Sequence, residues 1–527
     1  MPKRSSQRPF PALTLAPLCL ALAAVVVVAQ QQPPRTPPPA RAQTPTRAVQ
    51  SAVAPKAVYI PYSEAEPVVG TLAEILPAEL RGKRSREIAP LWPAWVARRD
   101  AEIRARLAQG DEDSLVNFLL FGTTFTRRPR VTFAQIGQLH GAPPATPGAS
   151  QTNGATTTAP NVVGSNAGKN EAARLVESRA GDLVAALAAP GTNDRLVFAR
   201  RILVEEKKFR VETPAGRAGA VKFLRAAVER VLGENEGYVR ALEAARLQGD
   251  PSGEFAERSR LYRERGLSSD TSLLPNFAVE ESLREIKSRA LLAPGAVRRV
   301  AVIGPGLDFT DKQEGYDFYP QQTIQPFAVV DSLLRLGLAA PSGVEVMTFD
   351  LSPRVNSHLE RAARAARAGQ GYTIQLPRDP AARWRPEAVA YWQRFGDRVA
   401  DPVAPIKVAG EAGGIILRAV RVRPQVAARL VPVDTNIVLQ RLELPEAERF
   451  DLIVATNIFV YYDIFDQSLA MLNVERMLRP GGLMLSNNAL LELPFFRVRS
   501  VGYHTTVYSD READGDHLVW YRLAPTP

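Results

Sequence analysis

The sequence predicts a two-part chain, in which a mostly α-helical region precedes an α/β domain built on a parallel sheet. Up to about residue 297, apolar residues recur at spacings of three and four, which indicates helices. From residue 298, strand-like runs alternate with helical segments, which is typical of a parallel α/β sheet. Two further β-rich runs, 496–509 and 517–523, flank a charged turn and predict a closing antiparallel hairpin. The four runs expected to form the parallel strands are 300–303, 344–349, 452–455 and 483–486.

Helices before residue 298 are indicated by their caps and their periodicity. Ser114 can cap a run in which Leu115, Phe118 and Leu119 share one face. Thr213 precedes Pro214 as an N-cap precedes proline at the first helical position. Another helix is expected over 280–291. After Pro214, the helical spacing continues through Val221, Leu224, Val228 and Val231. This whole region either recognises a substrate or partner or is a helical domain with solvated faces, and we favour the second interpretation.

The amino terminus has the layout of a secretory signal. Residues 1–29 carry three basic residues and no acid, and 10–29 are uncharged, with a small-residue cleavage site at Val27-x-Ala29. Twenty such residues also suffice for an uncleaved membrane anchor. We therefore expect an exported or membrane-anchored protein, with membrane contact through 10–29. The alternative is a cytoplasmic protein whose start codon is misassigned.

Composition divides the chain further. Residues 30–55 are rich in Pro, Gln, Thr and Ala and predict a disordered spacer. Residues 141–170 contain one charge and predict a low-complexity linker. The expected segments are the signal or anchor 1–29, the spacer 30–55, a helical region 56–140, the linker 141–170, a helical region 171–297 and the α/β domain 298–527.

Cysteine and histidine usage excludes several chemistries. The only cysteine, Cys19, lies in the predicted signal, so a mature chain has no thiol nucleophile, cysteine zinc site or disulfide. The four histidines are not spaced as ligands on one helix face, and we expect no metal site. No Gly-x-Ser-x-Gly elbow supports a serine nucleophile.

Residues suited to ligand binding follow the predicted strands. The first strand runs into Gly304-Pro305-Gly306, where glycines allow a sharp turn and close approach of the backbone to a ligand. The second strand ends in Asp350, an acid placed to accept hydrogen bonds from ribose hydroxyls. A Phe-Asp-Leu-Ile-Val run at 450–454 and a Leu-Arg-Pro-Gly-Gly-Leu run at 478–483 come later.

The order of these motifs over 298–527 resembles the class I S-adenosylmethionine-dependent methyltransferases, and 457–463 are similar to a stretch of the chemotaxis-receptor methyltransferases. The resemblance implies a Rossmann-like methyltransferase sheet and S-adenosyl-L-methionine as cofactor. It implies that Gly304 and Gly306 face the methionine part and that Asp350 holds the ribose. Asp434 would lie near the adenine and Asn457 at the methyl-transfer end. Tyr461, Tyr462 and Asp463 either border the substrate or cap and pack the next helix, and we favour packing for the tyrosines.

The chain departs from the family pattern near the glycines. Val302 stands where the family has an acid, and Asp308 stands in place of the third glycine. Asp308 would either bind the amino group of the cofactor or repel its carboxylate. The extra chain after the loop includes 316–320, a candidate lid over the site. Because methyl transfer depends mainly on positioning, the sequence names no catalytic residue.

The distribution of charge bears on the substrate. The net charge is +11, but residues 298–527 carry 26 basic and 26 acidic side chains, so a nucleic-acid substrate is not expected. We expect methyl transfer to a small molecule or a protein side chain. The alternative is an exported, catalytically inactive binding or scaffold protein on the same fold, and a nucleotide-dependent oxidoreductase is less favoured. The sequence leaves the oligomeric state open.

Overall fold

A computed structural model describes residues 56–132, 135–136, 139, 166–247, 262, 265–309, 316–340, 343–407, 414–487, 489–510 and 514–525. Contacts divide the chain into Met1–Ala52 and Val53–Pro527, and all described residues belong to the second unit. The predicted signal, the spacer and residues 141–165 of the predicted linker lie outside the described residues. Among the helices of the described part, none is long and apolar enough to cross a membrane.

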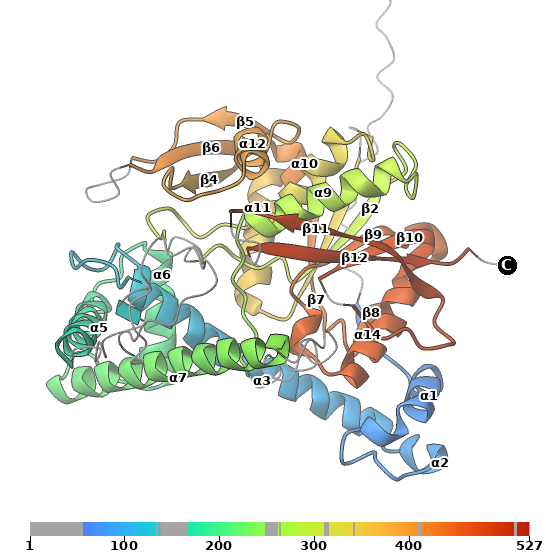
Figure 1. Cartoon of the computed structure of the whole chain (residues 1–527), viewed down its shortest axis with the longest axis horizontal. Coiled ribbons are helices and arrows are strands. Elements are labelled where there is room, and N and C mark those ends of the chain that lie inside the picture. The colour runs from blue at the N-terminus through green and yellow to red at the C-terminus, as the bar shows by residue number, and fades with distance from the viewer. Residues whose placement is uncertain are drawn as a thin grey trace, which may run out of the picture. The chain divides into compact units, whose positions relative to one another are not determined.

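A seven-stranded sheet in the order β11-β12-β10-β9-β2-β3-β7 forms the centre of the α/β part (Figure 1). The five strands from β10 to β7 are parallel, whereas β12 pairs antiparallel with both β10 and β11. The predicted Rossmann-like parallel sheet and closing hairpin are therefore confirmed. The strands are β2 (Arg299–Ile303), β3 (Glu345–Asp350), β7 (Leu430–Asp434), β9 (Phe450–Ala455), β10 (Leu478–Ser486), β11 (Val498–Val507) and β12 (Gly515–Leu523).

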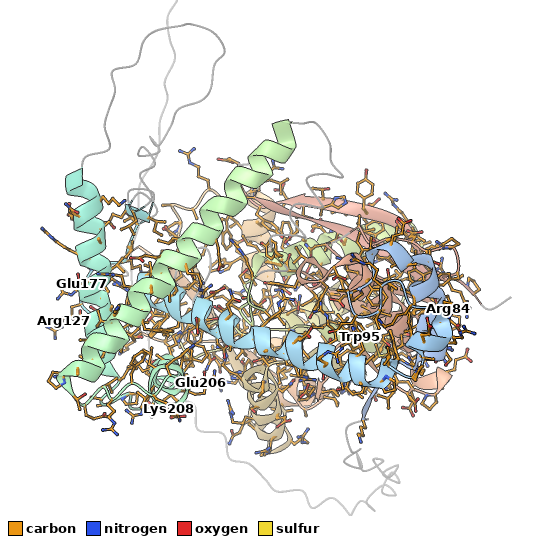
Figure 2. The ribbon with its side chains drawn as sticks, turned by 90° about the horizontal axis from the view of Figure 1, so that it is seen from below. Arg84, Trp95, Arg127, Glu177, Glu206 and Lys208 are labelled. Atoms are coloured by element: carbon orange, nitrogen blue, oxygen red, sulfur yellow. The ribbon has the colours of Figure 1, made fainter. Side chains whose placement is uncertain are left out.

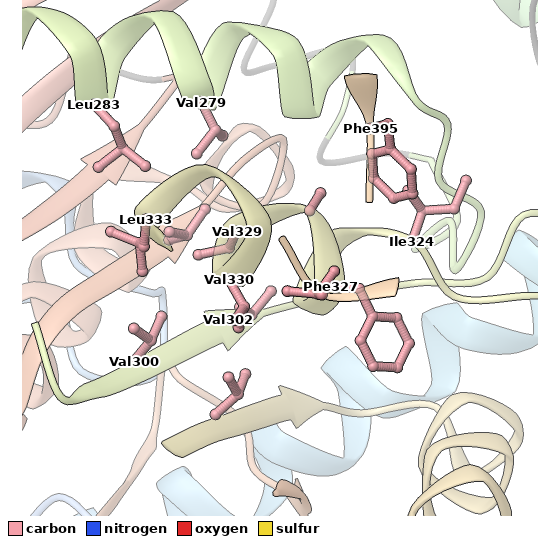
Figure 3. Packing of buried hydrophobic residues seen from close by; sticks show 14 of the residues in the cluster. Val279, Leu283, Val300, Val302, Ile324, Phe327, Val329, Val330, Leu333 and Phe395 are labelled. Atoms are coloured by element: carbon pink, nitrogen blue, oxygen red, sulfur yellow. The ribbon is translucent and has the colours of Figure 1, made fainter. Parts of the chain in front are cut away.

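Both faces of this sheet are covered, as its uninterrupted apolar strands require. Val300 and Val302 of β2 pack under α10 (Gln325–Arg335) and α9 (Leu274–Ser288), as Figure 3 shows. Ala301 and Ile303 point to the opposite face, where α14 (Ile464–Met477) and α1 (Tyr62–Thr71) cover them. The period of two along the strand thus divides the core into two layers.

The first half of the long helix α3 (Trp92–Phe121) belongs to this second layer. Trp95 packs edge-to-face against Phe465 of α14, with ring centroids 5.6 Å apart. Arg99 of α3 donates to Asp466 of α14 at 2.5 Å. Figure 2 shows Trp95 on α3, far along the helix from the part that α7 (Pro214–Leu247) crosses. The helical region and the α/β part therefore share one hydrophobic layer.

The second half of α3 forms a separate helical core with the predicted helices. Leu115, Phe118 and Leu119 pack there against Leu224 and Val228, which confirms the predicted apolar faces. Thr213 caps the next helix by accepting a hydrogen bond from the Gly216 N–H at 3.1 Å. The helices of this core are α5 (Asn166–Ala186), α6 (Asp194–Arg200), the π-helical turn η2 (Arg201–Glu206) and α7 (Pro214–Leu247). Helix α5 thus begins inside the segment predicted as a linker.

A long insertion between β3 and β7 forms a small sheet of its own. It has three antiparallel strands in the order β4-β6-β5, with Trp392 of α12 buried against it. The insertion comprises α11 (Pro353–Arg367), β4 (Tyr372–Arg378), α12 (Pro386–Arg394), β5 (Ala400–Val403), β6 (Ile416–Val422) and α13 (Pro424–Ala427). The remaining elements are β1 (Ala57–Tyr59), which pairs with β8 (Gln440–Leu442), and η1 (Ala73–Ile75), α2 (Ser85–Ile88), η3 (Glu446–Glu448) and η4 (Phe459–Tyr461).

Candidate functional site

A cavity of about 70 Å³ lies where four neighbouring parallel strands end. Ligands of open α/β sheets bind in this position, because the strand order reverses there and the loops diverge. The cavity walls come from the loops after β2, β3, β7 and β9, and from the segment before α9. The lining residues include Gly304, Gly306, Asp350, Thr435, Ile458 and Tyr462.

Two glycines after β2 have the backbone conformation that the turn requires. The φ angles of Gly304 and Gly306 are +63° and +60°, in the left-handed region. A Cβ atom on Gly304 would lie 2.2 Å from Ile458 Cδ1, and one on Gly306 would lie 2.9 Å from the Ser269 carbonyl oxygen. A side chain at either position would therefore collide with the residues that pack on the loop.

Asp350 ends β3 and lines the same cavity. Its Oδ1 accepts a hydrogen bond from the Ser352 N–H at 2.8 Å. Burial raises the pKa of the Asp350 carboxyl to about 6, although the backbone N–H groups of Ser352 and Gly306 lower it. The structure therefore brings Asp350 together with both glycines, as the sequence predicts.

A second cavity, of about 310 Å³, continues the site towards β10. It shares Gly304 and Ile458 with the first cavity and adds Gln325, Asn457 and Asn487. Asn457 has a φ of +57° and donates its N–H to Asn487 Oδ1 at 2.8 Å. Such a conformation is uncommon outside glycine and often marks a functional site. The structure thus places Asn457 at the opposite end of the site from Asp350.

The side chains of two other predicted cofactor residues are engaged by groups of the protein, although Asp434 is the neighbour of Asp350 on the adjacent strand. The carboxylate of Asp308 accepts hydrogen bonds from the Tyr319 hydroxyl and the Gln322 side chain, both at 2.9 Å. The Asp434 side chain is 57% exposed and pairs with Arg104 of α3 at 2.7 Å. Among the described residues that line the three cavities of this site, neither acid is present. The neighbour of Asp434, Thr435, lines the first cavity instead.

The segment considered as a lid is buried and anchored. Asp317 is 1% exposed and accepts hydrogen bonds from the backbone N–H and hydroxyl groups of Thr123 and Thr124, at 2.7 to 3.0 Å. Tyr319 is also buried, with its hydroxyl on Asp308. The expectation of a lid is therefore wrong, because this segment joins the glycine loop to the helical region.

Tyr461, Tyr462 and Asp463 lie directly before α14. Asp463 caps α14 by accepting a hydrogen bond from the Asp466 N–H at 2.9 Å. Both tyrosines line the first cavity, and burial raises the pKa of each hydroxyl. Tyr461 also packs edge-to-face against Tyr262, with centroids 5.4 Å apart.

A third cavity, of about 280 Å³, lies between the helical region and the strand ends. Asn117 and Phe121 of α3 and Val231 of α7 line one side of it. It shares Tyr461 and Asp270 with the second cavity. The helical region therefore forms part of the site.

Asp270 and its neighbours were missed by the sequence interpretation. Residues 268–272 read Ser-Ser-Asp-Thr-Ser, directly before α9, and Asp270 lines all three cavities. A run of polar side chains that are small enough to line a cavity was the available signal. The family resemblance covers only residues 298–527, so it assigns no role to this run.

The strand order, the glycine turn and the acid at the end of the adjacent strand define a Rossmann-like α/β fold with a ligand site at its strand ends. No family model matches the chain, and no curated protein matches it in sequence.

Solved structures similar to this chain include three methyltransferases. The N-methyltransferase NodS from Bradyrhizobium japonicum WM9, in complex with S-adenosyl-L-homocysteine, is 15% identical, covering 55% of this chain and 98% of NodS, with a TM-score of 0.23. The magnesium protoporphyrin IX methyltransferase ChlM from Synechocystis PCC 6803, with bound S-adenosylmethionine, is 8% identical, with coverages of 47% and 79% and a TM-score of 0.22. The CcbJ methyltransferase from Streptomyces caelestis is 18% identical, with coverages of 48% and 78% and a TM-score of 0.19. These TM-scores are low, so the fold class rests on the strand order of this chain.

Proposed function

We propose that the protein is an S-adenosyl-L-methionine-dependent methyltransferase that acts on a small molecule or a protein side chain. The observation that carries this proposal is the cavity in which Gly304, Gly306 and Asp350 meet. These are the residues that the family resemblance assigns to the cofactor. The finer similarity to chemotaxis-receptor methyltransferases stays a prediction.

The residues around the first cavity fit such a cofactor. The glycine loop would face its methionine part, because both glycines line the first cavity and let the backbone approach a ligand closely. Asp350 would hold the ribose, because an ionised carboxylate accepts hydroxyl hydrogen bonds strongly. When bound, the cofactor supplies an electrophilic methyl group on sulfur.

The second and third cavities would hold the methyl acceptor. Gln325, Asn457 and Asn487 present polar groups towards one end, and Phe121 and Tyr262 present aromatic surface towards the other. Holding two reactants in line supplies much of the rate enhancement in such a transfer. The helical region would then select the acceptor.

Two features favour this function over the others considered. The antiparallel hairpin β11–β12 extends the parallel sheet beyond β10. A nucleotide-dependent oxidoreductase would not account for this hairpin. The α/β part carries equal numbers of basic and acidic residues, so a polyanionic substrate finds no excess positive charge there. Export and membrane contact stay separate proposals, since residues 1–55 lie outside the described residues.

Calorimetric titration with S-adenosylhomocysteine tests the proposal. We expect binding to the wild-type protein, and roughly 10- to 100-fold weaker binding to Asp350→Ala because a buried acceptor for hydroxyl groups is lost. Glu345→Ala is the control: it removes an acid from the opposite end of the same strand, β3, where the side chain is 58% exposed and lines none of the three cavities. Absence of binding to wild-type protein at millimolar ligand would refute the proposed function.

A further inference from the structure

A short segment from the amino-terminal half of the chain runs directly beside the glycine loop. Leu307 donates its N–H to the Ser269 carbonyl oxygen at 2.8 Å, and the Thr271 N–H donates to the Leu307 carbonyl oxygen at 2.9 Å. These two bonds make a parallel bridge between Asp270 and Leu307. They fix Asp270 where it lines all three cavities.

The carboxylate of Asp270 is buried but only partly satisfied. Its side chain is 2% exposed. The Ser114 hydroxyl donates to Oδ2 at 2.8 Å, whereas Oδ1 accepts no hydrogen bond within the described part of the protein. Arg354 Nη2 forms a loose ion pair with Oδ1 at 3.6 Å, beyond hydrogen-bond distance. Buried carboxylate oxygens normally have a donor, so this atom is suited to a cationic group of a ligand.

No acid precedes the glycine loop, because Val302 occupies that position and is fully buried under α10. The acid that follows the loop, Asp308, accepts hydrogen bonds from Tyr319 and Gln322. Asp270 reaches the same loop from the other side. An ammonium group of a ligand at the glycine loop would find its carboxylate there.

We propose that Asp270 binds the ammonium group at the amino-acid end of the cofactor, so that the amino-terminal half of the chain completes the cofactor site. This inference rests on the proposed function. It also gives the segment 268–272 a role that the α/β part, residues 298–527, does not supply.

Paired titrations of the full chain with two ligands test the inference. S-adenosylhomocysteine carries the amino-acid end, whereas 5′-methylthioadenosine lacks it and keeps the nucleoside. For Asp270→Asn we expect about 10- to 100-fold weaker binding of S-adenosylhomocysteine, as for one lost charge-assisted hydrogen bond, and unchanged binding of methylthioadenosine. Equal losses for both ligands, or no loss for either, would overturn the inference. Tighter binding of S-adenosylhomocysteine would also overturn it, because it would place the ligand's carboxylate beside Asp270.

Two further variants control for an indirect effect through Arg354 and for misfolding of Asp270→Asn. Asp111→Asn is the matched control, since Asp111 also faces Arg354, at 3.7 Å, but lines none of the three cavities described. It should leave both affinities unchanged, and a loss equal to that of Asp270→Asn would mean that Arg354, rather than the ligand, carries the effect. If Asp270→Asn does not fold, Ser114→Ala decides: a several-fold loss confined to S-adenosylhomocysteine supports the inference, and no selective loss contradicts it. Wild-type protein that binds neither ligand would instead refute the proposed function.

Discussion

Asp350 is the residue whose environment most directly controls the proposed cofactor site. Its pKa is raised to about 6 by burial, so its proton is lost in the range where many binding experiments are done. Gly304, Gly306 and Asn457 surround the same site with positive φ angles. Glycine and asparagine tolerate this conformation best, which explains the residue types.

The raised pKa of Asp350 predicts a pH-dependent affinity. The ionised carboxylate should bind hydroxyl groups more strongly than the neutral acid, so a bound ligand should lower this pKa. Protons then compete with the ligand, and the Kd for S-adenosylhomocysteine should rise as the pH falls below about 6, approaching tenfold per pH unit. Titrations at pH 5, 6 and 7.5 measure this effect. In Asp350→Asn the rise should disappear, and a rise of equal size in that variant would assign the effect to another group.

At the scale of elements, buried polar anchors hold the loops that shape the site. Asp317 fixes the chain after the glycine loop to the end of α3. Strand β7, which is not among the strands predicted from the sequence, contains Pro432 in its middle. Proline is tolerated here since β7 is the edge strand of the sheet and pairs only with β3.

Removal of the Asp317 anchor should destabilise the protein. Asp317→Ala leaves two backbone N–H groups and two hydroxyls without their acceptor, so we expect a loss of about 2–4 kcal/mol in the free energy of unfolding. Chemical denaturation measures it. Asp401→Ala is the control, because its ion pair with Arg423 is 66% exposed on the aspartate side and should contribute below about 1 kcal/mol. Equal losses in the two variants would show that the hydrogen bonds of Asp317 contribute no more to stability than an exposed ion pair does.

At the scale of the whole described unit, α3 joins two hydrophobic cores. Trp92, Trp95 and Ile103 lie in the layer beneath the sheet, whereas Leu115 and Phe118 lie in the helical core. A single continuous helix therefore connects the sheet to the helices that line the third cavity. Loss of packing at one end of α3 should therefore lower the stability of both cores.

Trp95→Ala tests this coupling. Trp95 is 3% exposed, and its loss should cost about 3–5 kcal/mol. Far-ultraviolet circular dichroism and fluorescence of the remaining tryptophans should then report one shared unfolding transition at lower denaturant. Leu91→Ala, at a position 43% exposed, should have little effect. Two separate transitions in Trp95→Ala would contradict the coupling.

The pattern of apolar residues was enough to predict four of the five parallel strands of the described sheet and its closing hairpin, and Thr213 with Pro214 marked the start of a capped helix. The family resemblance assigned Gly304, Gly306 and Asp350 to one site, and these three residues line one cavity. Those features depend on local periodicity and on the rule that parallel strands end at one edge of the sheet. The positions of Asp308, Asp434 and Asp270 could not be predicted in this way. Each depends on a partner at least eleven residues away along the chain: Asp308 on Tyr319, Asp434 on Arg104, and Asp270 on Ser114 and the glycine loop. An acid's role is set by which side chains reach its carboxylate, and folding alone brings those side chains together.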